Sequence, residues 1–410
     1  MTLAIISAFP SDLAIELYGF SLLWGMVRVT SCLLVCALAG AAHADNPPIV
    51  DRNYAIDLYD GVAIGNTAMI AMGGAGAASI NGTAGALINP SAIAVRSTTD
   101  LDSWSWDYHL DVLTGKYSSD YDNNGVVTGE SSGASLITGG LGLRYHDWSI
   151  AATSFIQQAP VPGSSPALNA SATRVRFILG NYQSRYDLAI GAGVQVASFS
   201  LTAGNTQLFE VSGTGLIFGA TWLPHQESIR IGAAIDLPIS GGQVTTSTCN
   251  PMSCDGYILP DEVDSPARIV GGVAYRVGPT PWNQPTITSF RDERALTLAA
   301  DLVVTGATAN GYGIEAFSMK QLQRSGRSIA VSPRGGAEYE WLPGRLRLRG
   351  GSYWEPSRFD GVGGRLHVTI GAELAVWEFH LLGPHRLRLT FTADEATRYR
   401  NIGASIGFWH

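Results

Sequence analysis

Arg345-Leu346-Arg347-Leu348-Arg349 alternates charged and apolar residues, and Arg386-Leu387-Arg388-Leu389-Thr390-Phe391-Thr392 does the same. Successive side chains of a β-strand point to opposite faces, so the charges fall on one face and the leucines on the other. The stretch 294–304 repeats the arrangement. The pattern predicts a sheet with one polar and one apolar face, either in a soluble β-sandwich or in a membrane barrel.

The lengths of the strands and of their connections favour the membrane barrel. Many expected strands have roughly 10 to 14 residues, which suits a tilted crossing of the hydrocarbon layer. Short connections such as 146–147 and 343–344 alternate with long polar ones such as 114–131 and 240–265. Outer-membrane barrels have short periplasmic turns and longer external loops. We therefore expect an all-β fold, a 14-stranded antiparallel transmembrane β-barrel, with strands at 98–113, 133–146, 148–157, 171–181, 186–199, 205–222, 229–240, 266–277, 294–305, 327–342, 345–354, 364–376, 384–393 and 400–410.

The composition agrees with a membrane barrel and excludes a nucleic-acid partner. Charged residues make up 15% of the 410 residues, against roughly 25% in soluble proteins. A lipid-facing band needs no charge. The net charge of −8 opposes binding to phosphate backbones, which requires a basic face.

The N-terminus carries an export signal. Arg28 is followed by an apolar or small stretch from Ser31 to Ala42, and Ala42-His43-Ala44 forms an A-x-A cleavage site. We expect residues 1–44 to be leader and signal peptide, with the true start at Met26. A lipoprotein signal around Cys32 and an uncleaved anchor are the alternatives. An exported barrel implies the outer membrane of a Gram-negative-type bacterium, contact with its lipids, and recognition of the C-terminal strand by barrel-assembly machinery.

Residues 45–97 differ from the expected barrel, 98–410. Small residues dominate Ala71-Met72-Gly73-Gly74-Ala75-Gly76-Ala77-Ala78, and Asn89-Pro90-Ser91 follows. Small residues pack closely against other backbone, and a barrel of this size has a lumen too wide for its own side chains to fill. We therefore expect 45–97 to be an N-terminal plug, or hatch. A phosphate loop is the alternative, but no Lys-Ser/Thr ending accompanies the glycines, and no cofactor is expected.

Met72–Ala78 and Asn89-Pro90-Ser91 together resemble the hatch of the FadL-type outer-membrane transporters of hydrophobic compounds. The resemblance implies a 14-stranded barrel and a ligand pocket against the hatch. It also implies that the ligand leaves sideways through the wall into the membrane. It assigns ligand or hatch contacts to Gly73, Gly74, Gly76, Asn89, Pro90 and Ser91.

Three further groups of residues are candidate sites. Five arginines are expected to face the lumen, either to bind a carboxylate or to pair with wall acids: Arg345, Arg347, Arg349, Arg386 and Arg388. Cys249 and Cys254 lie in one loop of an exported protein and predict a disulfide, with metal binding as the alternative. Asp120, Asp122 and Asn124 match the opening of a calcium loop, although an Asx-rich hairpin explains them equally.

The sequence contains no enzyme motif, and we do not expect the protein to be an enzyme. The resemblance implies an outer-membrane transporter for long-chain fatty acids or other apolar compounds. The alternatives are a FadL-related scaffold or shuttle protein, a general porin, and, more distantly, a calcium-dependent surface protein.

Overall fold

The computed structural model describes residues 46–58, 65–95, 102–118, 120–127, 131–163, 168–246, 249–284 and 290–410. The chain divides into two compact units, and the second, Asn46–His410, is the one described below. The expected leader, 1–44, lies outside the described residues. So do 59–64 and 96–101, so the expected boundary between hatch and barrel at 97/98 stays a prediction.

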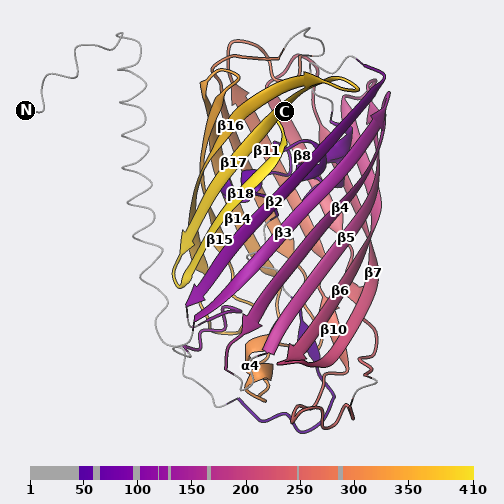
Figure 1. Ribbon diagram of the computed structural model, residues 1–410, viewed down its shortest axis with the longest axis vertical. Helices are drawn as coiled ribbons and strands as arrows, with labels where there is room; N and C mark the ends of the chain where they lie inside the picture. Colours follow the sequence, from indigo (N-terminus) through magenta and orange to yellow (C-terminus); the bar gives the residue numbers. More distant parts are fainter. Residues whose placement is uncertain are drawn as a thin grey trace, which may run out of the picture. The chain divides into compact units, whose positions relative to one another are not determined.

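Fourteen strands form one closed barrel (Figure 1), which confirms the predicted fold. Neighbouring strands follow one another in sequence, and the barrel closes where β18 pairs antiparallel with β2. The barrel strands are β2 (Trp104–Ser118), β3 (Ser131–Tyr145), β4 (Trp148–Val161), β5 (Leu168–Gln183), β6 (Leu188–Ala203), β7 (Thr206–Trp222), β8 (Ile229–Asp236), β11 (Arg268–Val277), β12 (Leu296–Thr305), β14 (Ala330–Leu342), β15 (Leu346–Glu355), β16 (Arg365–His380), β17 (Pro384–Ala396) and β18 (Tyr399–Phe408).

The outer face of the barrel is apolar. In β12, Leu298 and Leu302 are 46% and 48% exposed, whereas Thr297 and Asp301 point inward and are 7% and 5% exposed. Large exposed apolar side chains recur in this way around the barrel. A belt of this extent would drive aggregation in water, and it matches the hydrocarbon layer of a bilayer. The finding excludes the β-sandwich, in which the apolar face would be buried.

Exposed aromatic side chains gather at the end of the barrel where β2 begins and β18 ends. Aromatic girdles mark the interfaces of membrane barrels, and short turns mark the periplasmic side. Several short turns, including 146–147 and 343–345, lie at this end, which is therefore the periplasmic end. The aromatic residues are Trp104, Tyr145, Trp148, Trp222, Tyr275, Tyr339, Trp341 and Trp377.

The opposite, external end carries a second, small sheet. Its order is β13 (Gly311–Tyr312), β1 (Ala55–Asp57), β10 (Glu262–Ser265) and β9 (Ile239–Ser240). β1 pairs in parallel with both β10 and β13, so the start of the described chain lies among the external loops. The helix α4 (Ile314–Ser318) lies at the same end (Figure 1). No helix among the described residues is long and apolar enough for a bilayer crossing.

Candidate functional site

Residues 65–95, here called the lumenal segment, lie against the inner wall of the barrel. They form α2 (Thr67–Ala71), α3 (Gly82–Gly85) and the 3-10 helix η3 (Pro90–Ala94). α2 contacts β15 to β18, and η3 contacts β4 to β7. Nearly every residue of the segment is buried, and most side chains are small. The segment therefore occupies the space between opposite sides of the wall.

Two wall carboxylates hold the lumenal segment by its backbone. Asp301 Oδ2 accepts hydrogen bonds from the amides of Gly76 (2.8 Å) and Ala77 (2.9 Å). Asp111 Oδ1 accepts from the amide of Thr67 (2.9 Å) and from its hydroxyl (2.7 Å). Hydrogen bonds to a charged acceptor are stronger than neutral ones. These contacts fix the segment at two places far apart on the wall.

Glycines on both sides allow the lumenal segment to approach the wall closely. Gly73 has a φ of +62°, and a Cβ there would collide with the backbone of Gly335 and Ser352. On the wall, a Cβ at Gly336 would collide with the backbone of Met72, and one at Gly351 with that of Gly73. The small-residue pattern predicted this kind of contact.

Asn89-Pro90-Ser91 is an anchor for the lumenal segment. Asn89 Oδ1 accepts from the amide of Ser91 (3.1 Å), and Asn89 Nδ2 donates to the carbonyl of Ala77 (2.7 Å) and the hydroxyl of Thr221 (3.0 Å). Gly73, Gly74, Gly76 and these three residues line none of the cavities described below. Their role as ligand contacts therefore stays a prediction, and their observed contacts are with the wall and within the lumenal segment itself.

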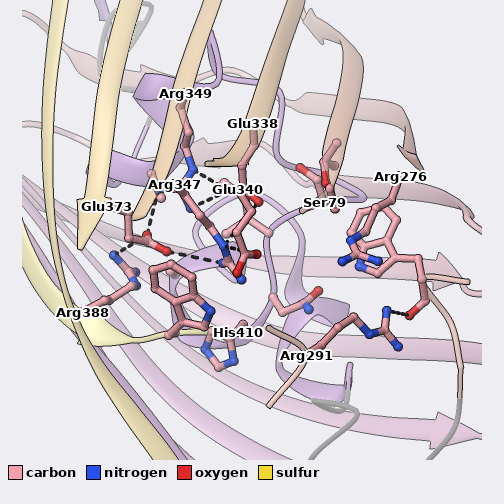
Figure 2. A pocket seen from close by; sticks show the side chains of 18 of the residues that line it. Ser79, Arg276, Arg291, Glu338, Glu340, Arg347, Arg349, Glu373, Arg388 and His410 are labelled. Atoms are coloured by element: carbon pink, nitrogen blue, oxygen red, sulfur yellow. Dashed lines mark hydrogen bonds and ion pairs between the residues drawn. The ribbon is translucent and has the colours of Figure 1, made fainter. Parts of the chain in front are cut away.

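An ionic network lines the lumen near its periplasmic end (Figure 2). Arg349 donates from Nε to Glu338 Oε2 (2.6 Å) and from Nη1 to Glu373 Oε2 (2.8 Å). Arg347 and Arg388 also form ion pairs with Glu373, at 3.4 Å each. Each of these arginines therefore has an acidic partner in the wall, as in an ordinary polar barrel interior.

The other two predicted arginines differ from each other. Arg386 pairs with both oxygens of Asp292, at 2.7 and 3.0 Å, in the connection between β11 and β12. Arg345 does not face the lumen as expected: it is exposed in the turn 343–345 and precedes β15. The turn extends through Arg345, so the strand begins one residue later than the sequence pattern indicated.

A cavity of about 140 Å³ lies beside this network, and its wall is strongly charged. Arg276 and Arg291 face it (Figure 2), as does Arg230, whose guanidinium lies 3.9 Å from the ring centre of Trp282. Arg276 pairs with Glu293 at 2.7 Å. A cavity with this many charges suits water and ions, and an apolar molecule would have to displace that water.

A second cavity, of about 80 Å³, lies at the external end and has a mostly apolar wall. Ile56 from β1, Phe199 from β6 and Ile314 from α4 line it, and Asp122 and Glu355 are among its polar residues. None of these apolar residues was predicted as a site. They come from segments far apart in sequence. Each of them is an ordinary apolar position in its own strand or helix.

One of the predicted calcium residues, Asp122, lines this external cavity. Asp120 and Asp122 gather with Glu315 of α4, a residue that the loop pattern did not reveal. Asn124 Oδ1 accepts from the amide of Val126 (2.7 Å), and the amide of Asn124 donates to Asp120 Oδ1 (2.9 Å). Burial, followed by the Asp122 carboxylate, raises the pKa of Glu315 to about 9. Burial also raises the pKa of Asp122 to about 6.

In the external loop between β8 and β11, Cys249 and Cys254 are joined by a disulfide, with Cα atoms 5.2 Å apart. This connection agrees with the predicted pair. Their thiols are therefore not available as metal ligands.

No family model and no curated protein matches this chain by sequence. Solved structures do match its fold. A Pseudomonas aeruginosa FadL homologue superposes with a TM-score of 0.55 at 13% identity, covering 84% of this chain and 97% of that one. The monoaromatic hydrocarbon channel CymD gives 0.53 at 13%, covering 85% and 98%. The Ralstonia pickettii toluene transporter TbuX gives 0.52 at 15%, covering 84% and 97%.

The barrel's own features and these comparisons agree. A closed antiparallel barrel with an apolar outer belt and periplasmic aromatic residues is the architecture of an outer-membrane protein of the Gram-negative type. The match covers nearly the whole length of each similar structure. The chain has the FadL-type fold: a 14-stranded outer-membrane barrel.

Proposed function

We propose that this protein transports hydrophobic small molecules across the outer membrane. The observation that carries the proposal is the mostly apolar cavity at the external end, between β1, the external loops and the barrel wall. An apolar molecule gains roughly 25 cal/mol for each Å² of its surface that leaves water. The external cavity therefore favours molecules arriving from outside the cell. The FadL homologue and the hydrocarbon channels named above support this substrate class.

We further propose that the ligand leaves sideways through the wall into the membrane. The straight path to the periplasm is obstructed by the lumenal segment, and beyond it lies the ionic network around Glu373. Moving an apolar molecule past paired arginines and glutamates would displace their hydration without replacing it. A sideways exit keeps the ligand in an apolar medium throughout.

The same features favour transport over two other functions. A general porin needs an open polar lumen, whereas the lumenal segment here is hydrogen-bonded to opposite parts of the wall. Catalysis is not part of the proposal, and the similar solved structures are transporters or channels. We propose that the segment acts as the hatch, and that barrel-assembly machinery recognises β18 during insertion.

An uptake assay in intact cells tests the proposal. The full chain is expressed in cells that lack their own hydrophobic-compound transporters. Uptake of radiolabelled oleate and toluene is then compared with uptake of a small sugar. We expect uptake of at least one apolar probe to rise above the empty-vector level while sugar uptake does not change. Equal uptake of apolar probes in both strains would refute transport, and increased sugar uptake would identify a porin.

A further inference from the structure

Three carboxylates from two separate external segments meet beside the external cavity. Asp120 and Asp122 belong to the loop between β2 and β3, and Glu315 belongs to α4. One oxygen from each lies within 4.8 Å of the others. Asp120 is 3% exposed and Glu315 is fully buried. Three carboxylates at this separation, when all are ionised, repel one another strongly wherever water is excluded, and a bound cation would remove that repulsion.

The backbone holds two of these carboxylates in place and leaves one oxygen of each uncommitted. Asp122 Oδ2 accepts from the amide of Glu315 (3.1 Å), and Glu315 Oε2 accepts from the amide of Tyr121 (3.1 Å). The remaining oxygens, Asp122 Oδ1 and Glu315 Oε1, are buried and have no hydrogen-bond partner. Buried polar atoms are nearly always paired, so these two oxygens require a partner.

Basic side chains nearby compensate only one of the three carboxylates. Arg365 and Arg398 each approach Asp120 at 3.6 Å. Within the described chain, no basic group forms a salt bridge with Asp122 or Glu315. Arg365 acts on Asp122 only at longer range, and it also faces Glu355 at 3.9 Å. The two uncommitted oxygens therefore lie on the two carboxylates that lack a cationic partner.

We propose that Asp120, Asp122 and Glu315 bind a divalent cation, and that Ca²⁺ is the ion that fits best. Ca²⁺ takes six to eight oxygen ligands at roughly 2.4 Å, so two of its ligands lie at most about 4.8 Å apart. The three carboxylates meet this limit without rearrangement. Mg²⁺ demands strict octahedral geometry at roughly 2.0 to 2.1 Å and gives up its water reluctantly, so a cluster of three protein carboxylates suits it less well. Backbone carbonyls and water would complete the Ca²⁺ shell.

The site would control the external cavity. Tyr121, Asp122 and Ile314 line that cavity, and they belong to the same two segments that supply the ligands. A bound cation would fasten the β2–β3 loop to α4 and so fix one side of the cavity. This consequence for ligand entry rests on the proposed transport function, whereas the cation site itself does not.

Direct binding to the purified full-length mature protein tests the site without any hydrophobic ligand. We expect Ca²⁺ to raise the thermal unfolding temperature after removal of metal with EDTA. Tb³⁺, a Ca²⁺ substitute, should show luminescence sensitised by Tyr121 that excess Ca²⁺ displaces. Glu315→Gln should weaken the apparent Ca²⁺ affinity by roughly tenfold or more, because ligand charge sets affinity in such sites.

The variants separate a cation site from a structural role. Glu315→Gln should be at least as stable as the wild type in EDTA, because it replaces a buried carboxyl group with a neutral amide of the same size, yet gain less from Ca²⁺. Asp122→Asn provides a second variant if Glu315→Gln does not fold. Asp255→Asn, an exposed acid in another external loop, is the control and should respond to Ca²⁺ like the wild type. An absence of Ca²⁺ stabilisation, or equal stabilisation of Glu315→Gln and the wild type, would overturn the proposal even if uptake is confirmed.

Discussion

Asp57 and Arg358 form an ion pair that is buried on both sides and joined by two hydrogen bonds. Arg358 donates from Nε to Asp57 Oδ2 (3.0 Å) and from Nη2 to Oδ1 (3.2 Å), and the side chains are 1% and 0% exposed. Thr308 and Ser325 also donate to the Asp57 carboxylate, each at 2.7 Å. The pair connects β1 to the external loop that follows β15.

Replacing Arg358 with Ala should destabilise the external end strongly. Asp57 would keep its charge in a buried place without a cationic partner, which costs roughly 3 to 5 kcal/mol. The free energy of unfolding in detergent and the rate of limited proteolysis near β1 measure the effect. Arg327→Ala is the matched control, because Arg327 and Asp360 form an exposed pair that contributes about 1 kcal/mol at most. Similar losses of unfolding free energy in the two variants would show that burial does not strengthen the contribution of the Asp57–Arg358 pair.

Gly336→Ala should displace the lumenal segment, whereas Gly335→Ala should not. A Cβ at Gly336 would collide with the Met72 backbone, whereas a Cβ at Gly335 would lie 3.8 Å from the nearest atom, the Ala299 carbonyl oxygen. Overpacking costs roughly 1 to 3 kcal/mol. We expect a higher ion conductance in planar bilayers for Gly336→Ala alone. Unchanged conductance in that variant would argue against a plugging role.

Ala172→Phe should reduce uptake of apolar probes by filling the external cavity. Ala172 points inward from β5 and lines the cavity, whereas its neighbour Thr173 does not line it. Thr173→Phe places the same side chain outside the cavity and serves as the control. The initial rate of oleate or toluene uptake, corrected for the amount of barrel in the outer membrane, is the measurement. Equal rates in the two variants would show that this cavity is not on the ligand's path.

Opening the disulfide between Cys249 and Cys254 should have a local effect. The two residues are five positions apart, and closing so short a loop contributes about 2 kcal/mol in the chain-entropy account. The Cys249→Ser, Cys254→Ser double variant should therefore unfold the external loop more readily and leave the barrel intact. Mass spectrometry of the untreated protein should find no free thiol at either position. A free thiol there would show that the pair is reduced.

The barrel was predictable because the alternation of polar and apolar residues that marks its strands is local and recurs along the chain. In β12, Thr297 and Asp301 point inward while Leu298 and Leu302 point outward, and the sequence shows this alternation directly. The close fit of the lumenal segment was also predictable, since only small residues allow contacts such as that of Gly73 with the wall. Both features depend on neighbouring residues, so a single sequence contains them.

The external sites were predictable only in part, because they join distant segments: the loop pattern pointed to Asp120 and Asp122 but not to their partner. Glu315 meets Asp122 across 193 positions of sequence, and nothing in the helix around Glu315 distinguishes it from an ordinary acidic residue near a helix start. The same is true of Ile56 and Phe199, which face one cavity from β1 and β6. Arg345 was assigned to the lumen from alternation alone, and the turn before β15 places it outside the strand.

The position of β1 bears on the order in which the parts of the molecule assemble. Its partners lie late in the chain: Ala55 is opposite both Glu262 and Gly311, and the bond from Thr308 to Asp57 spans 251 positions. Contacts between such distant residues form slowly, since a long loop must close first. We therefore expect the earliest described part of the chain to be among the last to find its place, after the barrel strands next to β10 and β13 have paired.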